Sequence, residues 1–141
     1  MREKPLILIV DDEKNLADIL TTKLNASGMD TVTAASGKEG IQKAEEMMPD
    51  LVLMDIKMPE MSGADAALAL RENPNTQGLK IAFLTSQSDP FPGLAGAGNN
   101  EDATRELGLD DFLMKTDDLD VNVQKIQEIL ARPPRPPQKP I

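Results

Sequence analysis

The stretch LILIVDDEKNLADILTTKLNASG, residues 6–28, holds the building block of the fold. Its first five residues form an uninterrupted apolar run, which is typical of a strand buried on both faces. Between residues 14 and 26 apolar side chains recur at helical spacing, and Gly28 then predicts the end of a helix. This segment therefore predicts a strand followed directly by a helix.

The same alternation continues along the chain. Further strands are predicted at 31–33, 51–54, 80–84 and 111–114, and further helices at 36–48, 63–72, 101–107 and 117–131. Ser36 is the expected N-cap of the second helix, Glu39 would complete a capping box, and Pro49 would end the helix. Alternation of this kind predicts an α/β fold with a doubly wound, five-stranded parallel sheet and helices on both faces.

The length of the chain, 141 residues, suits one domain. We expect this domain to cover residues 1–131, because five of the ten residues in RPPRPPQKPI at 132–141 are Pro. Residues 132–141 are then a Pro-rich tail or linker stub in an extended conformation. The connection at 86–100 is unusually long for a compact domain, and such loops are commonly functional or disordered.

The composition excludes several classes of function. The chain has no Cys and no His, so it has no disulfide, no catalytic thiol and no Ser–His pair. A net charge of -9 disfavours direct binding to nucleic acid or to anionic lipid surfaces. No apolar run is long enough for membrane insertion, and the expected location is cytoplasmic. Any metal ion must be held by oxygen ligands, which favours Mg²⁺.

Polar residues follow the predicted strands at their carboxyl ends. Asp11 and Asp12 follow the first strand, Asp55 the third, Thr85 the fourth and Lys115 the fifth. The carboxyl ends of parallel strands meet at one edge of a sheet, so these side chains should cluster there. Three neighbouring carboxylates would bind a proton or a cation such as Mg²⁺. Together with a Lys and a Thr, they are the groups needed for phosphoryl transfer to an aspartate.

These residues belong to four motifs, IVDDE (9–13), LMDIKMPEMSG (53–63), LTS (84–86) and GLDDFLMK (108–115). On these motifs the chain resembles the receiver domains of bacterial two-component response regulators, the CheY-like family, over about residues 4–131. The resemblance implies a flavodoxin-like (βα)5 fold with strand order 2-1-3-4-5. It implies that Asp55 is the phosphoacceptor. It also implies that Asp12, Asp55 and the backbone carbonyl of Lys57 bind Mg²⁺, with Asp11 acting through a metal-bound water.

The resemblance also implies a switch and its partners. Lys115 would pair with the phosphoryl oxygens, Thr85 would hydrogen-bond them, and the rotamer of Phe112 would follow Thr85. The phosphoryl donor would be a sensor histidine kinase or a phosphotransfer protein, as a separate molecule or a segment outside this sequence. A downstream protein would bind the face of the fourth helix, fifth strand and fifth helix. The chain would be a monomer or weak dimer, a signalling phosphoacceptor with slow autodephosphorylation rather than a turnover enzyme.

Some alternatives stay open at this point. A haloacid-dehalogenase-type phosphatase would need a second Asp where this chain has Lys57, and a flavin or dinucleotide binder would need a Gly-rich first loop. A phosphorylation-independent pseudo-receiver, acting as a protein-interaction module, is the main alternative. Lys115 precedes Thr116 where the family usually has a Pro in a cis peptide bond, so a cis or trans bond is left open. The loop at 86–100 would influence partner choice or access to the site.

Overall fold

The structure is a computed structural model that describes residues 3–85, 111–115 and 118–133. Its strands are β1 (Leu6–Val10), β2 (Asp30–Ala34), β3 (Leu51–Asp55), β4 (Ile81–Thr85) and β5 (Asp111–Met114). Its helices are α1 (Lys14–Ala26), α2 (Gly37–Met47), α3 (Gly63–Glu72) and α5 (Leu119–Ala131). The helix predicted at 101–107, the loop at 86–100 and the tail beyond residue 133 lie outside the described residues.

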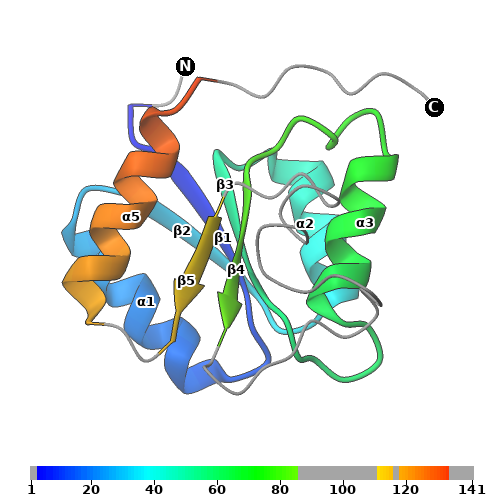
Figure 1. Cartoon of the computed structure of the whole chain (residues 1–141), viewed down its shortest axis with the longest axis horizontal. Helices are drawn as coiled ribbons and strands as arrows, with labels where there is room; N and C mark the ends of the chain where they lie inside the picture. The colour runs from blue at the N-terminus through cyan, green and yellow to red at the C-terminus, as the bar shows by residue number, and fades with distance from the viewer. Residues whose placement is uncertain (1–2, 86–110, 116–117, 134–141) are drawn as a thin grey trace.

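The five strands form one parallel sheet in the order β2-β1-β3-β4-β5, which confirms the predicted doubly wound fold. Helices α1 and α5 cover one face of the sheet, and α2 and α3 cover the other (Figure 1). All five strands run in one direction, so their carboxyl ends lie along a single edge (Figure 1). This is the edge at which the sequence places its candidate site residues.

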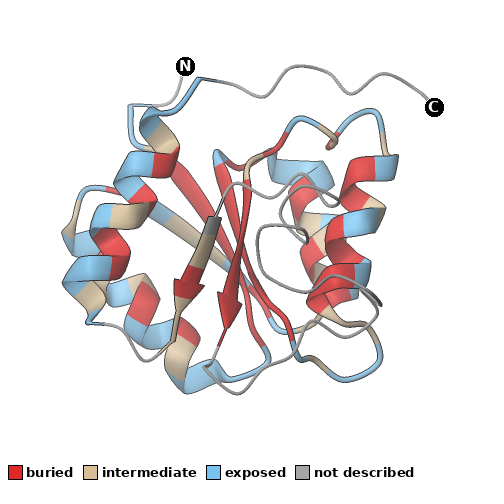
Figure 2. Ribbon diagram, in the orientation of Figure 1, coloured by how far each residue is buried: buried red, intermediate tan, exposed pale blue. Residues whose placement is uncertain are grey.

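The core explains the uninterrupted apolar runs of the strands. Successive side chains of a strand point to opposite faces of the sheet. In β1, Leu8 and Val10 pack with α2 and α3, whereas Ile7 and Ile9 pack with α1 and α5. Every residue of β1, β3 and β4 is buried, and the helices expose their outer faces (Figure 2).

The N-terminus of α2 differs in one detail from its prediction. Ser36 is the N-cap, and its side-chain oxygen accepts a hydrogen bond from the backbone N–H of Glu39 at 3.1 Å. The carboxylate of Glu39 accepts from the N–H of Ala35 at 2.6 Å, one residue before the partner that a capping box requires. The predicted reciprocal bond is therefore wrong by one residue, although the helix begins where expected.

Helix α3 begins in close contact with the end of β3. A Cβ atom at Gly63 would lie 2.1 Å from the backbone oxygen of Asp55, a separation that no side chain can occupy. The N–H of Gly63 also donates to the carbonyl of Ile56 at 2.8 Å. Glycine at this position therefore allows α3 to start directly beside the strand that ends in Asp55.

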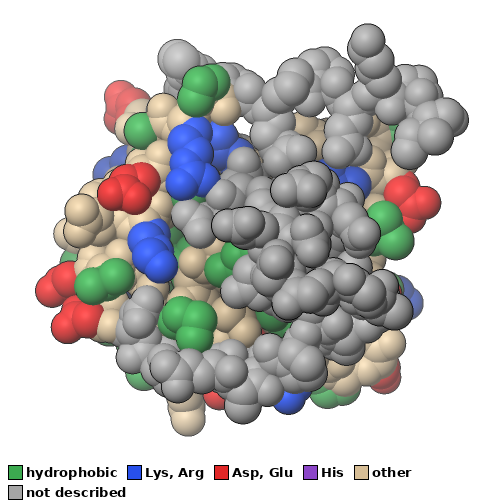
Figure 3. Space-filling model, viewed as in Figure 1, with side chains coloured by type: hydrophobic (Ala, Val, Ile, Leu, Met, Phe, Trp, Pro, Cys, Tyr) green, Lys and Arg blue, Asp and Glu red, His purple; other side chains and the backbone are tan. Residues whose placement is uncertain are grey.

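The outer surface carries charges of both signs. In the face viewed in Figure 3, acidic, basic and apolar side chains all appear on the part of the surface that the structure describes. Among the described residues, no helix has the length and apolar character required to cross a bilayer.

Candidate functional site at the carboxyl edge of the sheet

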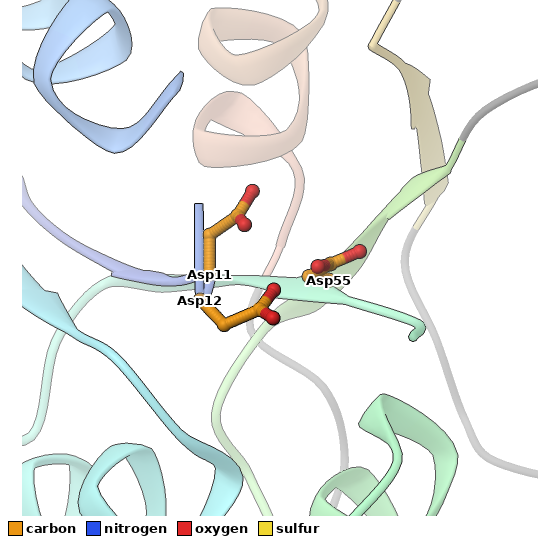
Figure 4. A group of neighbouring side chains, drawn as sticks. All are labelled: Asp11, Asp12 and Asp55. Carbon is orange, nitrogen blue, oxygen red and sulfur yellow. The ribbon is translucent and has the colours of Figure 1, made fainter. Parts of the chain in front are cut away.

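Three carboxyl groups meet at the ends of β1 and β3. One oxygen atom each of Asp11, Asp12 and Asp55 lies within 4.8 Å of the other two (Figure 4). The parallel register pairs Val10 with Met54, and it therefore brings the residues that follow them to the same level of the sheet. Asp11 and Asp55 are buried, at 2% and 1% exposure, whereas Asp12 is exposed. The cluster predicted from the sequence is present.

The turn after β1 holds Asp11 in place. Its backbone N–H donates to the carbonyl of Ala34 at 3.0 Å, which continues the hydrogen bonding of β1 with β2. Its Oδ1 atom accepts a hydrogen bond from the backbone N–H of Glu13 at 2.8 Å. The second oxygen of Asp11 is thereby left to face the site.

Lys115 supplies a positive charge to this cluster. Its ammonium nitrogen lies 3.0 Å from Asp55 Oδ1 and 3.6 Å from Asp11 Oδ2. It also lies 3.6 Å from Oε1 of Glu13, a contact that the sequence analysis missed. The position of Glu13, next to Asp11 and Asp12, was the signal that could have indicated this fourth carboxylate.

Burial and charge shift the pKa values of these groups. Burial raises the pKa of Asp55 to about 7, and the charge of Asp11 adds to this effect, although pairing with Lys115 opposes it. Burial also raises the pKa of Asp11, against the hydrogen bond from the Glu13 backbone and the charge of Lys115. Burial disfavours the charged form of Lys115, but the neighbouring carboxylates outweigh it and raise its pKa. Ionised Asp11 and Asp55 therefore need more positive charge than Lys115 supplies.

The site has the properties expected of a site for a divalent cation. Asp11 Oδ2 and Asp55 Oδ1 are buried and accept no well-aligned hydrogen bond within the described chain, although Lys115 contacts both. Buried carboxylate oxygens without such partners are costly unless a cation neutralises them. An all-oxygen donor set with an exposed member, Asp12, suits Mg²⁺, which keeps several water ligands.

The remaining predicted site residues surround this cluster. Thr85 is buried at the end of β4, and its carbonyl accepts the N–H of Lys115 at 2.8 Å. Phe112 is half-buried on β5, and its ring packs edge-to-face against Phe83 with centroids 6.0 Å apart. Lys57 is exposed in the loop after β3. Thr116 lies outside the described residues, and so does the Lys115–Thr116 peptide bond.

This fold and the polar cluster at the carboxyl edge of its sheet are those of a receiver-type signalling domain. Comparison with known proteins gives the family. The sequence model of the response regulator receiver domain matches residues 7–127, and the chain therefore belongs to this family. The crystal structure of a CheY-like response regulator receiver domain protein from Methanospirillum hungatei JF-1 is similar, with a TM-score of 0.77 and 27% identity. The match covers 91% of this chain and 94% of that one.

Two curated relatives are response regulators. The DNA-binding response regulator MtrA of Mycolicibacterium paratuberculosis is 36% identical over 115 residues, which cover 82% of this chain and 45% of that protein. The alkaline phosphatase synthesis transcriptional regulatory protein PhoP of Bacillus subtilis is 34% identical over 109 residues, covering 77% of this chain and 41% of that protein. The match thus spans less than half the length of these relatives.

Proposed function

We propose that this receiver domain accepts a phosphoryl group on the carboxylate of Asp55 in a Mg²⁺-dependent reaction. One observation carries the proposal. The carboxyl group of Asp55 ends a buried strand, lies within 4.8 Å of oxygens of Asp11 and Asp12, and is 3.0 Å from the Lys115 ammonium. A buried carboxylate held between a cation site and a fixed ammonium is arranged as a nucleophile for phosphoryl transfer.

Atoms and charge balance when a phosphohistidine of another molecule or segment is the donor. An oxygen of Asp55 attacks phosphorus, an O–P bond forms, and the P–N bond of a phosphohistidine donor breaks. The histidine nitrogen retains the electron pair and takes up a proton. Because this chain contains no His, the donor is a sensor histidine kinase or phosphotransfer protein, as a separate molecule or a further segment. Attack of water on the same phosphorus later breaks the bond to Asp55, regenerates its carboxylate and releases inorganic phosphate.

The residues around Asp55 would bind the cation and the phosphoryl group. Asp12, Asp55 and the backbone carbonyl of Lys57 would hold Mg²⁺, and Asp11 would act through a water of that ion. The bound ion supplies positive charge that keeps Asp55 ionised and offsets charge developing on the phosphoryl oxygens. The ammonium of Lys115 lies beside Asp55 and would pair with a phosphoryl oxygen.

Thr85 and Phe112 would transmit the change to a partner. The hydroxyl of Thr85 would hydrogen-bond the phosphoryl group, and the half-buried ring of Phe112 would adjust to its movement. A downstream protein would bind the face that includes β5 and α5. A local change in charge would then bias a two-state surface.

Intact-mass spectrometry after incubation with Mg²⁺ and acetyl phosphate tests this function. The wild type should gain the mass of one phosphoryl group, and Asp55→Asn should gain none. Asp30→Asn, at the exposed start of β2, is the matched control and should gain the group like the wild type. Chelation of Mg²⁺ should abolish the gain.

The opposite result has a clear meaning. If folded wild type and Asp55→Asn both stay unmodified with Mg²⁺ present, the proposal is wrong and the chain is a pseudo-receiver that acts through binding alone. If both are modified equally, the acceptor is another residue.

A further inference from the structure

The buried face of α5 includes a polar side chain, that of Asn122. Asn122 is 2% exposed and lies one helical turn before Ile126 and two turns before Ile129, both of which are fully buried. Its amide nitrogen donates a hydrogen bond to the carbonyl of Met114 at 3.1 Å. Its oxygen, Oδ1, is buried and accepts no hydrogen bond within the described residues.

Packing alone does not account for an asparagine here. A buried amide oxygen without a donor loses its hydration and regains nothing, whereas an apolar side chain at this position would not carry that loss. Among the described residues, the amide of Asn122 thus has one hydrogen-bond partner, and its nitrogen atom makes that bond.

That donor acts on the peptide group that carries Lys115. The carbonyl of Met114 and the N–H of Lys115 belong to the same planar unit. The N–H donates to the carbonyl of Thr85 on β4 at 2.8 Å, and the carbonyl accepts from Asn122 on α5. One side of the peptide plane is thus hydrogen-bonded to β4 and the other side to α5. Helix α5 lies beside β5 (Figure 1).

The orientation of this plane sets the direction in which Lys115 leaves the backbone. β5 ends at Met114, so Lys115 lies just past the last residue that the strand itself orders. Its ammonium must still reach Asp55 Oδ1 at 3.0 Å and Asp11 Oδ2 at 3.6 Å. A rotation of the peptide plane would move the long side chain away from both oxygens.

We propose that Asn122 is a positioning residue for Lys115, which it orients by clamping the Met114–Lys115 peptide. This inference rests on the proposed phosphoryl transfer to Asp55. Asn122 touches neither the reacting atoms nor the cation ligands, and it acts through Lys115 alone. Misplacement of a catalytic group by about 1 Å can cost up to about a hundredfold in rate.

The test is a double-mutant cycle on the rate of phosphorylation by acetyl phosphate with saturating Mg²⁺. Asn122→Leu removes the donor and keeps the branched outline of the side chain, and it should slow phosphorylation between about tenfold and a hundredfold. Circular dichroism should show that the variant remains folded under the conditions of the assay. In a Lys115→Met background the same substitution should have less than about a twofold effect, since the two residues act as a unit.

Two further variants serve as controls for the effect of Asn122→Leu. Gln124→Leu makes the same chemical change at an exposed position of α5 and should leave the rate unchanged. Asn122→Ala removes the amide without adding an apolar branch. It takes the place of the leucine variant if that variant does not fold, and it should likewise slow phosphorylation. A substitution that acts only on packing would slow the reaction equally in both backgrounds, which would overturn the proposal, as would a wild-type rate in Asn122→Leu.

A second measurement does not depend on phosphorylation. In chain labelled with ¹⁵N-lysine, the Lys115 ammonium should exchange its protons slowly in the wild type and faster in Asn122→Leu. Unchanged exchange would overturn the clamp. Wild type that fails to be phosphorylated while this exchange differs as expected would overturn the proposed function and leave only the clamp on Lys115.

Discussion

Replacing Asp55 with Asn should stabilise the metal-free protein at neutral and alkaline pH. Asp55 is 1% exposed, and burial raises its pKa from 3.8 to about 7. The folded chain therefore holds the proton more tightly than the unfolded chain. Ionisation of Asp55 must then destabilise the fold, by an amount that increases as the pH rises through the interval between these two values.

The size of the effect follows from the pKa values. With about 1.4 kcal/mol per pKa unit, the shift from 3.8 to about 7 corresponds to about 4 kcal/mol for the ionised form. This figure already contains the attraction of Lys115, which opposes the shift. The substitution Asp55→Asn removes the charge and nearly keeps the shape of the side chain. The variant should gain up to about 4 kcal/mol at pH ~8 and less than about 1 kcal/mol at pH ~4.

Urea unfolding followed by far-ultraviolet circular dichroism measures this difference, because the chain has no Trp or Tyr to report by fluorescence. The experiments are run in the presence of a chelator. Asp30→Asn, at an exposed position, should change the free energy of unfolding by less than about 0.5 kcal/mol at either pH. An Asp55→Asn variant no more stable than the wild type at pH ~8 would refute the reasoning that burial makes the Asp55 charge costly.

Three further predictions concern the packing of α3, the end of α5 and the affinity for Mg²⁺. Gly63→Ala should cost more than about 4 kcal/mol or prevent folding, because its Cβ would lie 2.1 Å from the Asp55 carbonyl oxygen. Gly78→Ala, with nothing within 4 Å, should cost less than about 1 kcal/mol in the same urea unfolding experiment, and equal costs would contradict the account. Lys80→Met should cost about 1–3 kcal/mol in urea unfolding, because Lys80 donates to three carbonyls at the end of α5 at 2.7, 2.9 and 3.2 Å. The exposed Lys38→Met is its control. The affinity for Mg²⁺, measured by calorimetry, should fall by up to about tenfold per pH unit below pH ~7, because a proton on Asp55 competes with the ion. A pH-independent affinity would argue against Asp55 as a ligand.

The positions of the strands and of most helices could be predicted because the chemistry is local, whereas the order of the strands followed from the resemblance to receiver domains. Apolar runs such as residues 6–10 and 51–54 mark strands buried on both faces, and a polar residue directly after a run marks the carboxyl edge. Asp11, Asp55 and Lys115 could be assigned to one cluster from this rule alone. The rule concerns backbone topology, which a sequence pattern specifies well.

The finer contacts could not be predicted, because they depend on side-chain directions. The carboxylate of Glu39 bonds to the Ala35 N–H instead of completing the expected box. Glu13, the third ion-pair partner of Lys115, stands next to Asp11 and Asp12 in the sequence, but its distance from Lys115 depends on how β1 and β5 are assembled in one sheet. Asn122 interrupts an otherwise apolar helix face, which is a signal in the sequence, but its target at Met114 requires the tertiary structure.

The central claim is that Asp55 carries the phosphoryl group, and chemical trapping tests it most directly. Borohydride reduces an acyl phosphate to an alcohol, so a phosphorylated aspartate becomes homoserine, which peptide mass spectrometry can locate. After treatment with acetyl phosphate and Mg²⁺, homoserine should be found at position 55 and at no other aspartate. Homoserine at another position, or an unreduced Asp55 in a chain that has gained phosphate, would contradict the account.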